Sequence, residues 1–267
     1  MILFPPAKIN IGLNVVERRL DGYHELETIM VPIPLFDALE ILPSSDFNWH
    51  QSGLLIDEPS DSNLCVKAFK LMQQEYNLGN VYMHLKKRIP MGAGLGGGSS
   101  DAAYVIKGLN ELFNLNISIS KQQGLASQLG SDCAFFIENE PQLATGRGEI
   151  LSPILINLSG LYLLLVKPSI HISTVQAYNG VHISGDTGQL LQQINSPVYT
   201  WKTSIKNDFE QHIFELHPTL HAIKEKLYQH GAIYASMSGS GSTMYGLFES
   251  KPENITFDDF EVFVLKF

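Results

Sequence analysis

A glycine-rich stretch, PMGAGLGGGSSDAA at residues 90–103, changes abruptly into helix-forming residues. The start of a helix presents unpaired backbone N–H groups and the positive end of the helix dipole, and glycines let a backbone approach a ligand closely. Together these features bind anions, and phosphate is the natural candidate. The hydroxyls of Ser99 and Ser100 can cap this helix, contact a phosphate or ligate Mg²⁺, and the sequence leaves these roles open.

Two common nucleotide-binding patterns fit this stretch only in part. Gly92, Gly94 and Gly97 satisfy G-x-G-x-x-G, but the dinucleotide form continues into a second parallel strand that ends in an acidic residue. Here the chain stays helical to about Glu111. The phosphate loop of many ATPases requires a lysine where Gly98 stands. A bound phosphate must therefore find its cation elsewhere, unless the glycines only permit a tight turn.

Three further features suit phosphoryl transfer, which depends on positioning, charge stabilisation and a base near the attacking oxygen. Lys8 supplies a cation, Asp132 a carboxylate, and SGSGS at residues 238–242 a second glycine turn. Each also has a plain structural interpretation, namely an exposed lysine, a turn-forming aspartate and a hairpin turn. The basic trio at residues 86–88 is either a solvated strand end or an aid to anion binding.

Hydrophobic periodicity predicts the elements that position these residues. Residues 7–15 alternate between apolar and polar, which predicts a half-buried strand with Lys8 and Asn10 on one polar face. A second alternating run at residues 81–85 leads into the glycine loop, and apolar residues at helical spacing follow the loop as far as Phe113. The expected order is therefore strand, glycine loop, helix.

Other elements are expected on both sides of this unit. Prolines within residues 26–41 predict short or edge strands. Asp61 or Ser62 is expected to cap a helix that ends near Tyr76, and a helix is expected from Ser120 to Leu129, with Gly130 at its C-terminal cap. In the second half we expect a strand at 161–167, helices at 173–178, 188–194 and 218–230, two strands around 238–242 and a final strand. This mixture predicts an α+β protein, with one domain at residues 1–155 and a second at 156–267.

Composition excludes several classes of protein. With 267 residues and a net charge of −9, the chain is long enough for a stable core and too acidic to attract nucleic acid or an anionic membrane. Its two cysteines suit a reducing cytoplasm and imply no disulfide framework. A basic leader and a long apolar run are both missing, so we expect an untargeted cytoplasmic protein, either a monomer or a homodimer.

A metal site held by the protein is not expected. His217 and His221 are spaced like a metal pair, but Pro218 predicts that a helix begins between them, so the two side chains would not share a helical face.

The order of Lys8, DGYHEL at residues 21–26, the glycine loop, Asp132 and the second glycine turn resembles the GHMP kinase superfamily, which includes galactokinase, homoserine kinase and mevalonate kinase. Within it, PAKINIGLNV, RRLDGYHELETIM and MSGSGST resemble one branch more closely. That branch uses ATP to phosphorylate the 2-hydroxyl of a methylerythritol linked to cytidine diphosphate, in non-mevalonate isoprenoid biosynthesis. The resemblance implies a two-domain α+β fold with the active site in the cleft between the domains.

The same resemblance implies a role for each matching residue. Asp132 would accept the proton of the 2-hydroxyl, and Lys8 would stabilise charge near it, while Mg²⁺ would arrive with ATP. The residues implied to contact ATP are Pro90, Met91, Gly92, Ala93, Gly94, Leu95, Gly96, Gly97, Gly98, Ser99 and Ser100. Those implied to contact the cytidylated substrate are Asn10, Tyr23 and His24 on one side and Thr174 and Tyr178 on the other. Tyr178 opposite Tyr23 suits this role, because a pyrimidine ring can stack between two aromatic rings.

Two alternatives stay open at this point. Another small-molecule kinase of the superfamily, of the homoserine or mevalonate type, is disfavoured by DGYHEL and Tyr178. A nucleotide-binding regulator on the same fold is disfavoured because Lys8 and Asp132 are both present. The family commonly has Val-Pro where this chain has Cys133-Ala134, and we expect the Cys133 thiol to be a small buried apolar group.

Overall fold

The computed structural model describes residues 1–54, 59–181, 183, 185, 188–257 and 259–267. The chain divides into two compact units that interleave along the sequence. Unit 1 comprises Met1–Ala7, Leu35–Met91 and Gly96–Glu140, and unit 2 comprises Lys8–Pro34, Gly92–Leu95 and Pro141–Phe267. The glycine loop therefore contributes residues to both units.

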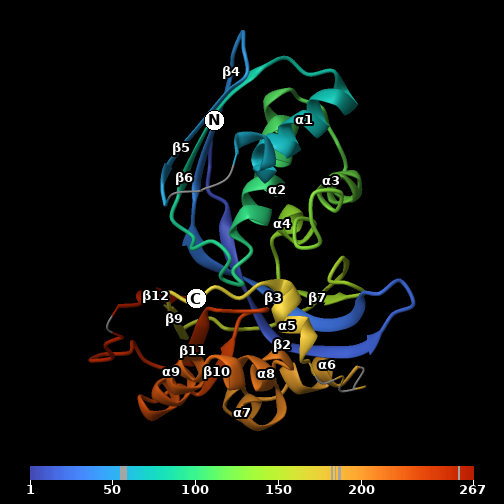
Figure 1. The fold of residues 1–267 in the computed structure, drawn as a ribbon. Helices are drawn as coiled ribbons and strands as arrows, with labels where there is room; N and C mark the ends of the chain where they lie inside the picture. The colour runs from blue at the N-terminus through green and yellow to red at the C-terminus, as the bar shows by residue number, and fades with distance from the viewer. Residues whose placement is uncertain (55–58, 182, 184, 186–187, 258) are drawn as a thin grey trace. The chain divides into compact units, whose positions relative to one another are not determined.

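Unit 1 contains a four-stranded sheet with helices on one face (Figure 1). Its strands, in spatial order, are β1 (Ile2–Leu3), β4 (Ala38–Pro43), β6 (Val81–Lys87) and β5 (Asn48–Gly53). β5 pairs with β6 in parallel, and the other pairs are antiparallel. The covering helices are α1 (Leu64–Tyr76) and α2 (Gly97–Leu112), which pack against each other. The predicted order of strand, glycine loop and helix is confirmed by β6 and α2.

The helix caps in unit 1 differ from those expected. Asn63 caps α1, and its side chain accepts a hydrogen bond from the N–H of Cys65. The predicted cap at Asp61 or Ser62 was wrong because Ser60–Ser62 forms a short 3₁₀ helix (η1) of its own. Ser118 caps α3 (Ile119–Ala126), so the predicted start at Ser120 was also wrong. The described part of unit 1 also contains α4 (Phe135–Glu138).

Unit 2 contains two further sheets of four strands each. The first has the order β2 (Pro6–Arg18), β3 (His24–Phe36), β7 (Gln142–Thr145) and β8 (Ile150–Pro153). β2 and β3 are its two long strands, and most of each belongs to unit 2. The second has the order β10 (Tyr234–Met237), β11 (Met244–Phe248), β9 (Tyr162–Lys167) and β12 (Glu261–Lys266). β10 and β11 confirm the two strands predicted around the second glycine turn.

The two long strands correct the predictions made for them. β3 lies inside its sheet, although its prolines predicted short or edge strands. β7 pairs only with Thr28, Ile29 and Met30, so Pro32 and Pro34 lie outside that pairing and their missing N–H groups interrupt no hydrogen bond to β7. β2 is buried on both faces as far as Leu13, because other parts of the chain cover the polar face that was expected to be solvated.

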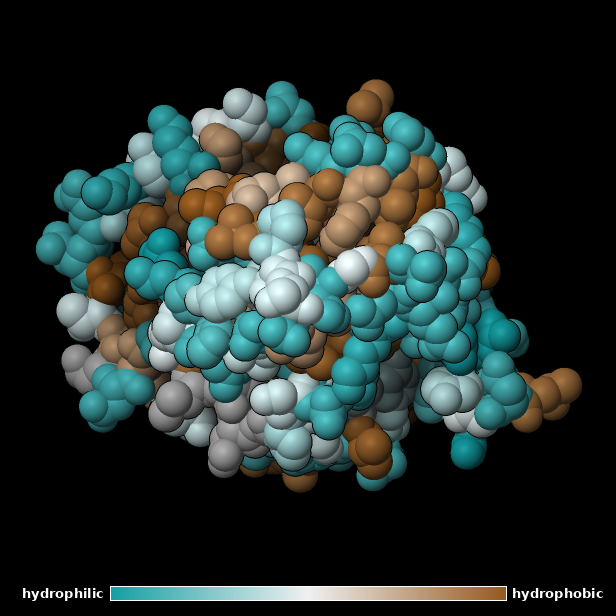
Figure 2. Space-filling model, turned by 90° about the horizontal axis from the view of Figure 1, so that it is seen from above, coloured by the Kyte–Doolittle hydropathy of each residue, from teal (hydrophilic) through white to brown (hydrophobic). Residues whose placement is uncertain are grey.

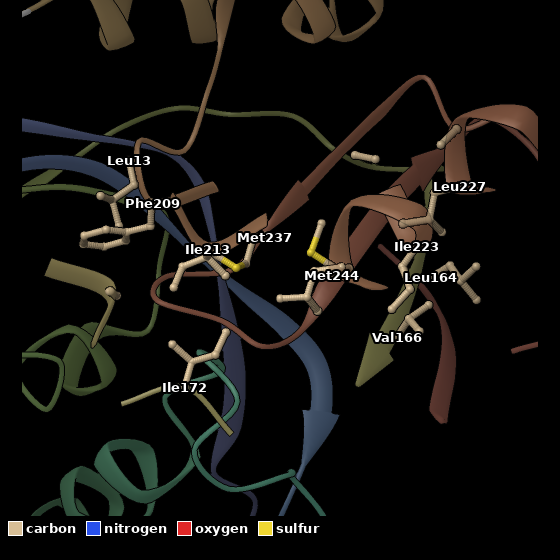
Figure 3. Packing of buried hydrophobic residues seen from close by; sticks show 14 of the residues in the cluster. Leu13, Leu164, Val166, Ile172, Phe209, Ile213, Ile223, Leu227, Met237 and Met244 are labelled. Atoms are coloured by element: carbon tan, nitrogen blue, oxygen red, sulfur yellow. The ribbon is translucent and has the colours of Figure 1, made fainter. Parts of the chain in front are cut away.

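The core of unit 2 lies between its second sheet and nearby helices (Figure 3). Met237 and Met244 come from β10 and β11, and Ile213 and Ile223 come from α8 (Phe209–Leu216) and α9 (Pro218–Gln229). α8 was not predicted, whereas α9 was. The described part of this unit also contains α5 (Thr174–Asn179), α6 (Gln189–Ile194), η2 (Val198–Thr200) and α7 (Trp201–Ser204). This packed layer holds β10, β11 and the turn between them in place.

The surface mixes polar and apolar side chains, and Figure 2 shows both kinds over one face of the molecule. None of the helices that the structure describes has the length and apolar character needed to cross a bilayer.

Candidate active site

Lys8 and Asn10 lie on the same face of β2, as predicted, but both are buried. Their exposed fractions are 3% and 2%, respectively. The ammonium of Lys8 donates a hydrogen bond to Oδ1 of Asn10, and Nδ2 of Asn10 donates to Oγ1 of Thr28 at 3.0 Å. Because Thr28 in turn donates to the carbonyl of Gly12 at 2.6 Å, this chain of hydrogen bonds fixes the amide of Asn10 and with it the orientation of Lys8.

The two glycine turns meet beside Lys8 in unit 2. Oγ of Ser238 donates to the carbonyl of Gly94 at 2.8 Å, and the N–H of Lys8 donates to the carbonyl of Leu95 at 2.9 Å. A Cβ on Gly94 would lie 1.9 Å from the carbonyl oxygen of Ser238, so only glycine allows this approach. A Cβ on Gly239 would lie 3.6 Å from Nζ of Lys8. Lys8 therefore packs directly beside both glycine turns.

The start of α2 has the backbone geometry expected of an anion site. Gly96 precedes the helix with a left-handed φ of 68°, and among the described residues no side chain caps the first turn. Gly98 is exposed, and within the described ranges a Cβ there would meet only Leu64, at an ordinary 3.9 Å. Ser99 is half-buried, whereas Ser100 is fully buried and its hydroxyl has no hydrogen-bond partner among the residues that the structure describes. The open side of the turn is thus formed by Gly98 and Ser99.

Asp132 lies in a tight turn of unit 1 that follows α3. The N–H of Cys133 donates to the carbonyl of Gly130 at 3.1 Å, which closes the turn and leaves Asp132 half-buried. Cys133 is fully buried, as predicted, and burial raises the pKa of its thiol to about 12, while a hydrogen bond with Ser99 acts in the opposite direction. This contact links the turn that carries Asp132 to the first turn of α2.

A buried triad of charges lies beneath the glycine loop in unit 1 and was not predicted. The ammonium of Lys87 donates to carboxylate oxygens of Asp37 and Asp101, and all three side chains are at most 2% exposed. Burial, only partly offset by Lys87, raises the pKa of Asp101 to about 7. The sequence held a signal, because Lys87 continues the buried alternation of Val81, Met83 and Leu85 along β6. The trio at residues 86–88 therefore divides into two exposed cations and one buried one.

The residues implied to bind the cytidylated substrate lie in unit 2, and some of them contact each other. The rings of His24 and Tyr178 are stacked with centroids 4.8 Å apart and an interplanar angle of 19°. Tyr23 is exposed, and the guanidinium of Arg147 lies 4.9 Å from its ring centroid. Thr174 is exposed as the first residue of α5, which Ser173 caps as predicted. The structure thus stacks His24, and not Tyr23, against Tyr178.

The start of α2 fits the phosphates of a nucleoside triphosphate. The first turn of α2 offers backbone N–H groups at a glycine, which has no side chain, and the buried hydroxyl of Ser100, which no described residue bonds, adds a polar group at that turn. No cluster of three potential metal-ligating side chains occurs in the part of the chain that the structure describes. His217 precedes α9, which begins at Pro218, as predicted.

Two family models match the chain and define its class. Residues 63–139 match the N-terminal domain of GHMP kinases, and residues 190–256 match their C-terminal domain. A mevalonate kinase structure from Methanococcus jannaschii is similar in fold, with a TM-score of 0.75 at 16% identity, covering 100% of this chain and 98% of that one. The fold and the glycine loop therefore define a small-molecule kinase of the GHMP class.

Curated relatives narrow this class. A 4-diphosphocytidyl-2-C-methyl-D-erythritol kinase from Bacteroides fragilis is 51% identical over 98% of this chain and 96% of its own length. One from Cytophaga hutchinsonii is 48% identical over 95% of this chain and 94% of its own. A crystal structure of a 4-(cytidine 5'-diphospho)-2C-methyl-D-erythritol kinase has a TM-score of 0.81 at 32% identity, covering 94% of this chain and 91% of that one. The chain belongs to the 4-diphosphocytidyl-2-C-methyl-D-erythritol kinase family.

Proposed function

We infer that this protein transfers the γ-phosphoryl group of ATP to the 2-hydroxyl of 4-diphosphocytidyl-2-C-methyl-D-erythritol, giving the 2-phosphate and ADP. The observation that carries this inference is 51% identity to a relative of that name over 98% of the chain. The local geometry around Lys8, the glycine loop and the His24–Tyr178 stack supports it. The reaction belongs to non-mevalonate isoprenoid biosynthesis.

Asp132 is the proposed general base. The 2-hydroxyl oxygen attacks the γ-phosphorus, the bond from that phosphorus to the β-phosphate oxygen breaks, and the hydroxyl proton passes to the Asp132 carboxylate. Its half-buried position in a closed turn keeps the carboxylate in a defined place without enclosing it. The pair of electrons from the broken bond leaves with ADP.

Lys8 is the proposed cation for the charge that develops during transfer. Its ammonium is held by Asn10 and packed beside both glycine turns, so it needs little rearrangement when the phosphoryl group moves. Asn10 was expected to contact the cytidine end of the substrate. Because it is 2% exposed and bonded to Lys8 and Thr28, we assign it instead to positioning Lys8.

The glycine loop, residues 90–100, is the proposed cradle of the ATP phosphates. The N–H groups of the first turn of α2 bind the phosphate oxygens, and Gly98 leaves room for them. Mg²⁺ bound with ATP would supply neutralisation of charge on the triphosphate. Between the two serines, the half-buried Ser99 is the better candidate to reach it, because Ser100 is fully buried.

The cytidine base is proposed to bind at the aromatic group of unit 2. His24 and Tyr178 already form a flat stacked pair, and Tyr23 is exposed next to His24 in the chain. A pyrimidine can stack on such a surface with little loss of side-chain entropy. Thr174 offers a hydroxyl at the start of α5.

A coupled assay of ADP release tests the function. The protein is incubated with Mg²⁺ and ATP together with the cytidylated methylerythritol, homoserine, mevalonate or no alcohol. We expect ADP release only with the cytidylated alcohol, with one phosphate added per molecule by mass spectrometry. Release with homoserine or mevalonate would instead assign another kinase of the class. ATP binding without release for any alcohol would favour a regulator.

A further inference from the structure

The buried triad of Asp37, Lys87 and Asp101 joins the two ends of the glycine loop. Lys87 is the last residue of β6, three positions before the loop begins at Pro90, and Asp101 lies in α2 directly after the loop ends at Ser100. The ammonium of Lys87 bonds to the carboxylate of Asp101 at 2.8 Å. One hydrogen bond therefore closes the loop at its base.

Asp37 fixes the N-terminal end of the glycine loop through further hydrogen bonds. Its Oδ1 accepts hydrogen bonds from the backbone N–H groups of Arg88 and Ile89, the latter at 2.8 Å, while its Oδ2 accepts from Lys87. The N–H of Asp37 donates to the carbonyl of Pro5 at 2.9 Å, which holds Asp37 itself. The backbone that enters the loop is therefore set by hydrogen bonds with defined directions.

The C-terminal end of the glycine loop packs directly on Lys87. A Cβ on Gly97, the first residue of α2, would lie 2.8 Å from Nζ of Lys87 and 2.8 Å from Cγ2 of Ile89. The first turn of the helix thus rests on the ammonium group itself. The absence of a side chain at Gly97 is explained by this contact inside the protein.

An apolar core would be a less costly way to fill this space. Removing charges from water costs several kcal/mol for each ion, and a buried ion pair often stabilises a protein no more than hydrophobic residues of the same size. Such groups can instead contribute specificity, because hydrogen bonds fix directions that apolar packing leaves free. A phosphate site needs this, since its N–H groups must be held to within a fraction of an ångström.

We propose that Lys87 and Asp101 are positioning residues for nucleotide binding: their hydrogen bond holds the first turn of α2 at the height and rotation that the triphosphate requires. The inference rests on the proposed function in so far as ATP is the ligand of the glycine loop. It adds a role for two residues that do not themselves reach the ligand.

Shape-matched variants of Asp101 test the proposal. Asp101→Leu keeps the branched shape but cannot accept from Lys87, which retains Asp37 as a neutralising partner. Asp101→Asn keeps an acceptor oxygen. We expect D101L to raise the Kd for ATP, measured by calorimetry without any alcohol, by about tenfold or more, and D101N to restore it to within about threefold of the unchanged protein. The KM for the alcohol should stay within about threefold in both variants.

Lys107 provides a matched control on the same helix. Its ammonium donates to the carbonyl of Ile137 at 2.9 Å and ties the middle of α2 to the end of α4. Lys107→Met removes that tie, so it should lower the melting temperature without changing the Kd for ATP. If D101L proves insoluble, Asp101→Ser, whose hydroxyl is too short to reach Lys87, replaces it.

The outcomes separate this proposal from the proposed function. A lowered melting temperature with an unchanged Kd for ATP in D101L would reduce the triad to a structural ion pair and overturn the proposal. Equal losses in D101L and D101N would overturn it as well, because the hydrogen bond would not be the cause. If the unchanged protein binds ATP but phosphorylates no cytidylated alcohol, the proposed function fails, and the Kd values still decide the role of Asp101.

Discussion

The ammonium of Lys8 is hydrogen-bonded to the side-chain oxygen of Asn10, two residues further along the same buried strand. A lysine buried at 3% exposure must find such partners, because an unpaired buried ammonium is strongly disfavoured. Asn10 is itself fixed by Thr28. The pair therefore gives Lys8 a defined position before any substrate arrives.

Replacing Asn10 should lower turnover more than it lowers nucleotide affinity. In Asn10→Leu, Lys8 loses the acceptor that orients it, so we expect kcat to fall about tenfold or more with KM for ATP within about threefold. Tyr245→Phe is the matched control, because the hydroxyl of Tyr245 donates to the backbone carbonyl of Asn10 at 2.8 Å and not to its side chain. Steady-state kinetics of both variants test whether Asn10 positions Lys8. Equal kcat values in N10L and the unchanged protein would contradict this role.

Asp132→Asn should separate binding from catalysis. The amide has the shape of the carboxylate but cannot take the hydroxyl proton, so we expect kcat to fall by roughly 10²-fold or more with little change in the Kd for ATP. Rapid-quench measurement of a single turnover checks that the chemical step is the one affected. A variant that turns over as fast as the unchanged protein would remove Asp132 from the mechanism.

Two glycines of the loop should respond differently to the same substitution. Gly98→Ala adds a methyl group that would contact Leu64 at an ordinary 3.9 Å, so stability should change little while crowding of the triphosphate raises the Kd for ATP. Gly94→Ala places a methyl group 1.9 Å from the carbonyl of Ser238, at a left-handed φ of 75°, and should lower the melting temperature itself.

Thermal unfolding and calorimetry of the two glycine variants test this distinction. The reverse pattern, with G98A unstable and G94A unaffected, would show that the loop is packed differently. Gly97→Val is a poorer test of ATP contact than either, because its side chain would strike Lys87 and Ile89 inside the protein.

His24 should stay neutral to a lower pH than an ordinary histidine. Burial lowers its pKa from 6.5, with a smaller contribution from the charge of Arg18. Since the unfolded chain then binds the proton more readily, the contribution of His24 to stability is present above about pH 6.5 and is lost as the pH falls through the lowered folded pKa. An NMR titration of the His24 ring should give a midpoint below 6.5.

Tyr178→Ala tests the cause of that shift. The variant removes the ring stacked on His24 and opens it to water, so the midpoint should move back towards 6.5 and the KM for the cytidylated alcohol should rise. Tyr23→Ala is the comparison, because its ring lies against Arg147 and should leave the His24 midpoint nearly unchanged. A midpoint unaffected by Y178A would contradict the assigned cause.

Local patterns in the sequence were sufficient for many elements. The alternation of residues 81–85, the glycines and the apolar stripe after them predicted β6, the loop and α2, because each depends on neighbours only a few residues away. The cap at Ser173 was predicted for the same reason. The family was also apparent from the motifs, and it is confirmed by the domain models and relatives.

Only the tertiary structure decided what covers each element. The buried Lys8 and Asn10 form hydrogen bonds with Thr28, Leu95 and Ser238, which are far from them in sequence. The pairing of Lys87 with Asp37 spans 50 positions, so the alternation along β6 could place this cation on the buried side, but no local pattern could reveal the carboxylate that it meets there. Short-range periodicity determines which face of a strand or helix a residue lies on. The opposite charge that a buried ionic side chain needs comes from distant segments of the chain, and only the whole fold brings those segments together.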